Sequence, residues 1–154
     1  MHDGITLASG RAGVERGSGL LSRLVAFLLG FPEAGNDVPL SVRFAPSLAG
    51  ETWTRTFAGK TFSSDQFAGR RRSAQLLCER FGPMTFAMAL VADGSRLRLV
   101  LRRWSVFGVP LPIWLGPRSD SYETVEGGRF RFHVEIGHKL TGLIVRYQGW
   151  LEPR

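Results

Sequence analysis

The sequence predicts a mainly β (α+β) protein, in which a curved antiparallel sheet is closed or half-closed into a barrel and one apolar helix lies near the N-terminus. Two observations predict this class. After residue 32, apolar side chains recur at every second position through a series of short segments. Connections of hairpin length separate these segments, and Asp93-Gly94 and Gly127-Gly128 are typical of tight turns. Many short strands in succession are typical of a meander that curls into a barrel.

Length and composition favour one globular domain spanning residues 1–154. A chain of 154 residues is long enough to bury one substantial core. The content of 44% hydrophobic and 21% charged residues excludes a disordered chain. Cys78 is the only cysteine, so no intrachain disulfide can form. A lone cysteine within an apolar run fits a buried residue in a reducing compartment, and we expect a cytoplasmic protein.

The chain is strongly basic, with a net charge of +7. Lys60 and Lys139 are the only lysines, so nearly all of the positive charge is arginine. This preference for arginine over lysine is typical of a GC-rich coding bias. The positive charge itself is typical of a solvated surface. An anionic membrane, in peripheral contact, or a nucleic acid would also suit this charge. The arginine runs at 70–72 and 102–103 do not form a known single-strand-binding pattern with the tryptophans, which disfavours nucleic acid.

A helix is expected from Gly19 to about Leu29, with Ser18 as its N-cap and Gly30 and Pro32 ending it. Apolar residues cover most of its surface, so it must be buried or lie against lipid. The run is too short to span a bilayer, which needs roughly 20 apolar residues. Arg23 interrupts it, and no small-x-small cleavage site follows, so a signal peptide is disfavoured.

Eight or nine strands are expected at close spacing, and the lead-in before the helix holds at most one strand, around 5–14. The expected strands cover residues 38–48, 51–57, 61–67, 73–81, 85–91, 97–106, 121–125, 129–136 and 143–151. In the strand at 129–136, phenylalanine and aliphatic residues alternate with charged ones, which indicates one wet face and one inward face.

Arg55 departs from this alternation, because it shares a strand face with Trp53 and Phe57. If those aromatic residues point inward, the guanidinium does too, and a buried charge needs a partner. Glu79, Glu123 and Glu135 are the candidate partners. The group would then be a structural ion pair, an arginine stacked on Trp53, or an anchor for an anionic head group at the mouth of a cavity.

Motifs for catalysis or cofactors are missing from the sequence. There is no nucleophile elbow and no glycine-rich phosphate loop, so we expect no cofactor. His133 and Glu135 share a strand face and His138 follows, but no third ligand stands at a recognisable spacing, so we expect no metal site and give little weight to His133 as a general base. The proline-rich segment 109–117, with Trp114, is either a lid on the barrel end or a flap or docking surface.

Several stretches jointly resemble a bacterial family, the domain-of-unknown-function family number 4166, which occurs alone or downstream of saccharopine-dehydrogenase-like domains. The similar stretches are residues 13–17, the helix through Pro32, 37–39, 51–57, 79–83, 108–112 and 142–151. The resemblance covers nearly the whole chain and implies no established activity. It implies that the helix belongs to the domain, and it favours Arg55, Glu79 and Tyr147 over the histidines. It also implies additional sequence before Met1-His2-Asp3, so that a short N-terminal element is missing here.

We therefore expect a domain that binds an apolar or amphipathic ligand, such as a fatty acid, isoprenoid or lipid-like metabolite, without catalysis. A barrel of about eight strands encloses room for side chains or one small ligand. The ligand-binding candidates are Arg55, Trp53, Phe57, Glu79, Tyr147 and Trp114. The alternatives are an accessory domain that contacts a nucleotide-binding oxidoreductase through the helix or the proline-rich segment, and an enzyme that uses Glu79, Tyr147 and Arg55.

Overall fold

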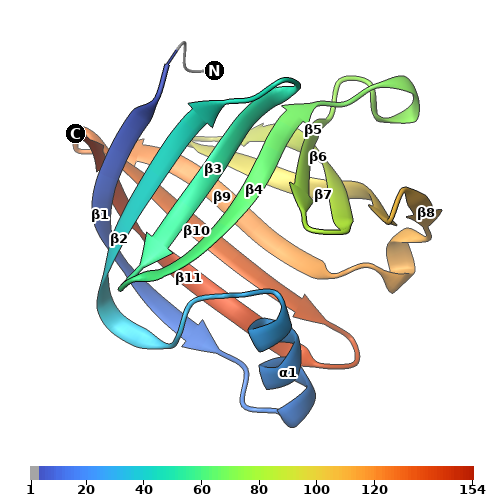
Figure 1. Cartoon of the computed structure of the whole chain (residues 1–154), viewed down its shortest axis with the longest axis horizontal. Helices are drawn as coiled ribbons and strands as arrows, with labels where there is room; N and C mark the ends of the chain where they lie inside the picture. Colours follow the sequence, from blue (N-terminus) through green and yellow to red (C-terminus); the bar gives the residue numbers. More distant parts are fainter. Residues whose placement is uncertain (1–3) are drawn as a thin grey trace.

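The computed structural model describes residues 4–154, and within that range ten strands form a closed antiparallel barrel (Figure 1). The expectation about Met1, His2 and Asp3 concerns residues outside this range. The barrel strands are β1 (Thr6–Arg16), β2 (Gly35–Pro46), β3 (Gly50–Phe57), β4 (Lys60–Ala68), β5 (Leu77–Phe81), β6 (Met84–Asp93), β7 (Arg96–Val106), β9 (Arg118–Glu126), β10 (Arg129–His138) and β11 (Gly142–Pro153). A short strand, β8 (Val109–Leu111), pairs with the end of β7.

Neighbouring barrel strands are mostly neighbours in the chain, as a meander requires. Two pairings join segments distant in sequence: β1 pairs with β11, with Val14 opposite Tyr147, and β7 pairs with β9, with Leu99 opposite Ser121. The β6–β7 hairpin completes the circle. The predicted fold class is thus confirmed, in its closed form.

The strand expected around 5–14 is confirmed as β1, but the prediction differed from the structure elsewhere. The proline-rich segment contributes β8 and the 3₁₀ turn η2 (Ile113–Leu115). The strand expected at 73–81 begins only at Leu77, after the 3₁₀ turn η1 (Arg71–Ser73). Arg71 and Gln75 have φ values of 53° and 68°, so the chain turns back on itself there instead of extending.

The apolar core lies on the side of the barrel formed by β1 to β4 and β11. Its buried members include Val14, Leu40, Val42, Phe57 and Val145. Phe57 stacks on Phe62 and meets Tyr147 edge-on, with ring centroids 5.9 and 5.4 Å apart. Burying one side of the interior in this way leaves the opposite side less filled.

Small residues let β1 and β11 approach closely where the sheet curls. A Cβ atom placed on Gly149 would lie 2.0 Å from the carbonyl oxygen of Arg11 on β1. Its register partner, Ala12, is also a small residue. Glycine within a strand marks such a bend or close backbone approach.

The strand connections alternate between two ends of the barrel. We call one the helix end: it carries the helix α1 (Leu20–Leu28), the β3–β4 and β5–β6 turns, the β7–β9 connection and the β10–β11 turn. The other is the termini end, where β1 begins and β11 ends (Figure 1) and which also carries the β2–β3 turn, the β4–β5 loop with η1, and the β6–β7 and β9–β10 turns.

Helix α1 begins after Gly19 and not after the predicted cap, Ser18. No side chain caps its first turn; instead the Ser22 hydroxyl donates a hydrogen bond to the Gly19 carbonyl at 2.8 Å. Gly30, at φ 71°, ends the helix as predicted. Arg16 then fixes the exit of the chain, because its guanidinium donates to the Pro32 and Phe31 carbonyls.

Only Ser22 and Ala26 of this helix are buried. Leu20, Phe27 and Leu28 are exposed by 85%, 71% and 70%, so the protein itself does not cover the apolar surface noted in the sequence. Among residues 4–154 no helix has the length and apolarity needed to cross a membrane.

Replacing Gly149 tests the close approach of β1 and β11. We expect Gly149→Ala to lower the free energy of unfolding by about 1–3 kcal/mol, because the new methyl group meets backbone that cannot move aside. Urea denaturation measures the change. Gly13→Ala, in β1, is the matched control, since its Cβ would meet no atom within 4 Å. Equal stability of the two variants would contradict this account.

Candidate ligand cavity

The barrel encloses a cavity of about 450 Å³. Its wall is largely apolar, with Leu40, Val42, Phe57, Phe86 and Phe132 among the lining side chains. Cavities of this size and character suit a single small organic ligand. The wall continues to the helix end, where Leu21, Val25, Leu29, Leu115 and Leu140 contribute.

Arg55 projects into this interior and forms a buried polar group with Ser64 and Glu79. Its guanidinium donates to the Ser64 hydroxyl at 2.8 Å and to the Glu79 carboxylate at 3.1 Å. The Ser64 hydroxyl in turn donates to the same carboxylate oxygen at 2.5 Å. The Arg55 and Glu79 side chains are 12% and 11% exposed, so this ion pair lies largely away from bulk solvent.

The guanidinium also lies over the rings of Trp53 and Phe62, at 5.2 and 5.4 Å from their centroids. Both structural roles expected for Arg55, the ion pair and the stack on Trp53, are therefore confirmed, with Glu79 as the partner. Glu135, another candidate, lies on the outer face and accepts a hydrogen bond from Arg146.

Glu123 and Tyr147 are two further residues with polar groups in the cavity wall. Burial raises the pKa of Tyr147 to about 12, and the charge of Glu79 adds to this effect while Arg55 opposes it. Burial also raises the pKa of Glu123, again with a smaller contribution from Glu79 and opposition from Arg55. Within residues 4–154, neither side chain forms a hydrogen bond. Tyr147 therefore faces the cavity as a protonated hydroxyl, and Glu123 faces it as a carboxyl group whose charged form is disfavoured by burial.

The other predicted residues divide between the cavity and the surface. Trp53 and Phe57 line the cavity, as do Arg55, Glu79 and Tyr147. Trp114 does not: it lies in η2 at the helix end and is 64% exposed. In the connection that carries Trp114, β8 pairs with the edge of β7 that faces away from β6, and the Trp104 ring nitrogen donates to the Pro112 carbonyl at 2.9 Å.

The sequence analysis missed two contributors to the wall. Glu123 was considered only as a partner for Arg55, although it alternates with Ser119 and Ser121 on the same strand face, and all three line the cavity. The side chains with which α1 lines the cavity were not named either. A helix that is apolar all round gives no sign of which side chains form a cavity wall.

On the outer face, Asp120 lies beside His133 and Glu135, with ligand atoms within 4.8 Å of one another. Asp120 supplies the third possible metal ligand, which the spacing of residues in the sequence did not reveal. It is the register partner of Glu135 on the neighbouring strand. However, Arg98 and Arg146 donate to the Asp120 and Glu135 carboxylates, each at 2.9 Å. The hydrogen bond from Arg146 is the main cause of the lowered pKa of Glu135. This group is therefore a surface ion network.

Removing the partner of Arg55 tests whether this ion pair supports the fold. We expect Glu79→Gln to lower the free energy of unfolding by about 3 kcal/mol, because it leaves a buried guanidinium without a counter-charge. Glu135→Gln, which breaks a more exposed arginine pair, should cost about 1 kcal/mol or less. Chemical denaturation of both variants measures the difference. Similar losses would show that burial adds nothing to the Arg55 pair.

The raised pKa of Glu123 predicts a specific dependence of stability on pH. A carboxyl group whose pKa is higher in the folded than in the unfolded chain destabilises the fold as pH rises above its unfolded value, since the folded state then holds the proton more tightly. We expect Glu123→Gln to raise the melting temperature at pH 8, with the gain vanishing at pH values below the ordinary glutamate pKa. Thermal melts at a series of pH values measure this. A loss of stability at pH 8 would contradict a desolvated Glu123.

Comparison with known proteins supports one assignment. Neither the curated proteins nor the solved structures contain a significant match to this chain. A family model described as a domain of unknown function, DUF4166, matches residues 2–151. Because this match spans nearly the whole sequence, the chain belongs to the DUF4166 family.

Proposed function

We propose that this barrel binds an apolar ligand with one uncharged, hydrogen-bonding head group, and that it acts as a carrier or sensor without catalysis. The observation that carries the proposal is the interior cavity of about 450 Å³, with a largely apolar wall and a few polar groups. An apolar pocket with a few placed polar groups is the usual form of a small-molecule site. Isoprenoid or long-chain alcohols, aldehydes and esters are ligands of this class.

The charges inside the cavity favour a neutral head group over a carboxylate. The positive charge of Arg55 is already matched by Glu79 at 3.1 Å. An added anion would meet Glu79 and Glu123 with no uncompensated cation, and burying an unpaired charge is costly. A hydroxyl or carbonyl oxygen, in contrast, adds no charge and can accept a hydrogen bond from the Tyr147 hydroxyl, whose pKa of about 12 keeps its proton in place at neutral pH.

The same electrostatics make catalysis by Glu79, Tyr147 and Arg55 the weaker proposal. Arg55 and Ser64 both donate to the same Glu79 carboxylate oxygen, so that oxygen is already occupied by protein donors. Tyr147, with a pKa of about 12, holds its proton at neutral pH and is poorly suited as a base. These groups are better suited to positioning a ligand than to moving its protons. The buried free thiol of Cys78 suits a cytoplasmic setting for such a carrier.

Mass spectrometry of the gently purified protein tests the proposal first. We expect a stoichiometric apolar adduct, which organic extraction would release for identification. Protein stripped of ligand should then bind a fluorescent long-chain alcohol more tightly than the corresponding fatty acid. An empty protein that takes up neither probe would overturn the proposal, and a preference for the acid would overturn the neutral head group.

Tyr147→Phe should locate the head group. Losing one hydrogen bond should weaken alcohol binding by about fivefold to tenfold with the fold retained. Thr54→Val is the matched control, because it also removes one hydroxyl group but lies outside the cavity wall, on the opposite face of β3, where Ser63 donates a hydrogen bond to it. Equal effects of the two variants on affinity would place the head group elsewhere.

A further inference from the structure

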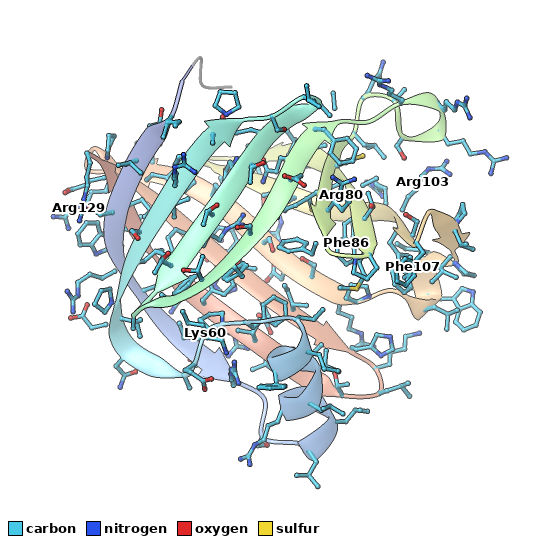
Figure 2. All side chains as sticks on the ribbon, in the orientation of Figure 1. Lys60, Arg80, Phe86, Arg103, Phe107 and Arg129 are labelled. Carbon is cyan, nitrogen blue, oxygen red and sulfur yellow. The ribbon has the colours of Figure 1, made fainter. Side chains whose placement is uncertain are left out.

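The helix end of the barrel carries a continuous apolar surface. Eleven of the eighteen large apolar side chains exposed among residues 4–154 lie there. We call these eleven the apolar rim: Leu20, Leu21, Leu24, Phe27, Leu28, Phe107, Val109, Ile113, Trp114, Leu115 and Leu140. Figure 2 shows side chains projecting outward from α1 and from the region of β8, where Phe107 is labelled.

Three segments form this rim, and hydrogen bonds join them. The amide of Gly17, just before α1, donates to the carbonyl of Ile144 on β11 at 3.2 Å. The β10–β11 turn then joins η2, since the His138 ring lies 2.9 Å from the Leu115 carbonyl oxygen. In Figure 1, α1, the β10–β11 turn and β8 follow one another around this end of the barrel. The exposed apolar side chains thus belong to one surface.

The charge around the rim has one sign. Residues 17–32, 106–118 and 138–142 contain no aspartate or glutamate, but they contain Arg23, Arg118 and Lys139. Among the residues that the structure describes, these three cations form no ion pair. Glu33, the acidic residue that follows the helix, is paired with Lys60 and Arg16. The rim is therefore apolar at its centre and positively charged around it.

We propose that the apolar rim docks on the surface of an anionic lipid bilayer. Its leucine and phenylalanine side chains would enter the boundary between head groups and acyl chains, while Arg23, Arg118 and Lys139 contact anionic head groups. Apolar insertion combined with basic residues is how interfacial segments bind anionic membranes. Exposed Trp114 suits the same boundary, where tryptophan is enriched.

The position of the cavity gives this docking a consequence. Leu21, Leu115 and Leu140 belong to the rim and also line the cavity, so the cavity wall reaches the proposed bilayer surface. A lipid-like ligand could pass between bilayer and barrel without crossing water. This last step rests on the function proposed above; docking itself does not.

Vesicle sedimentation tests the docking. The protein should bind vesicles of phosphatidylcholine with 30% phosphatidylglycerol, bind poorly to phosphatidylcholine alone, and detach as salt is added. Phe27→Glu should lower binding at least tenfold by placing a charge in the apolar centre. Leu48→Glu is the matched control, because Leu48 is fully exposed at the termini end and its replacement changes net charge equally.

A second pair of variants tests the electrostatic part. Lys139→Gln should weaken binding about fivefold, the effect expected of one basic residue near an anionic surface. Arg72→Gln, in η1 at the termini end, removes the same charge and should leave binding unchanged. Equal effects would show that net charge, and not the rim, attracts the vesicles.

Other outcomes would overturn the proposal. Wild-type protein that does not bind anionic vesicles, or Phe27→Glu that binds as well as Leu48→Glu, would do so. If sedimentation of the free protein revealed a dimer that Phe27→Glu dissociates, the rim would instead be covered by a second copy of this chain. Capture by a nucleotide-binding oxidoreductase domain without vesicle binding would assign it to a protein partner. Binding of the alcohol probe to Phe27→Glu in solution keeps the cavity test separate from the docking test.

Discussion

Closure of the sheet by ten strands is the constraint on which the other features of this structure depend. Barrel diameter grows with strand number, and about eight strands already enclose an interior that side chains just fill. Two further strands widen the interior beyond what side chains close. The aromatic and aliphatic core against β1 to β4 and β11 fills one side, and the cavity is what remains.

A wide interior also explains how a guanidinium can lie inside the barrel. Arg55 needs a partner on another strand, and Glu79 reaches it across β4, with Ser64 between them. The guanidinium of Arg55 also lies over the rings of Trp53 and Phe62. The carboxylate of Glu79 neutralises the positive charge of Arg55. Glu123 and Tyr147 have no such partner among residues 4–154, although both line the same cavity.

Local patterns were enough to predict the fold class and part of the cavity. Alternation placed Trp53, Arg55 and Phe57 on one inward face, and turn residues marked most hairpins. Closure could not be predicted, because the β1–β11 and β7–β9 pairings join segments distant in sequence. Trp114 was predicted as a ligand contact from the apolar, proline-rich segment around it, whereas its position depends on how β8 pairs with the edge of β7.

Helix α1 shows why a sequence that is apolar all round need not be buried. Ser22 and Ala26, one turn apart, are its small residues, and they are the side chains buried where α1 meets the start of β11. Val25 and Leu29 turn to the cavity, and Leu20, Leu24 and Phe27 face outward. Only the face that packs on β11 and the face that lines the cavity need to be apolar for the protein to fold. The outward face lowers solubility without adding to the stability of the fold. This pattern is expected when a helix also inserts into an apolar phase outside the protein.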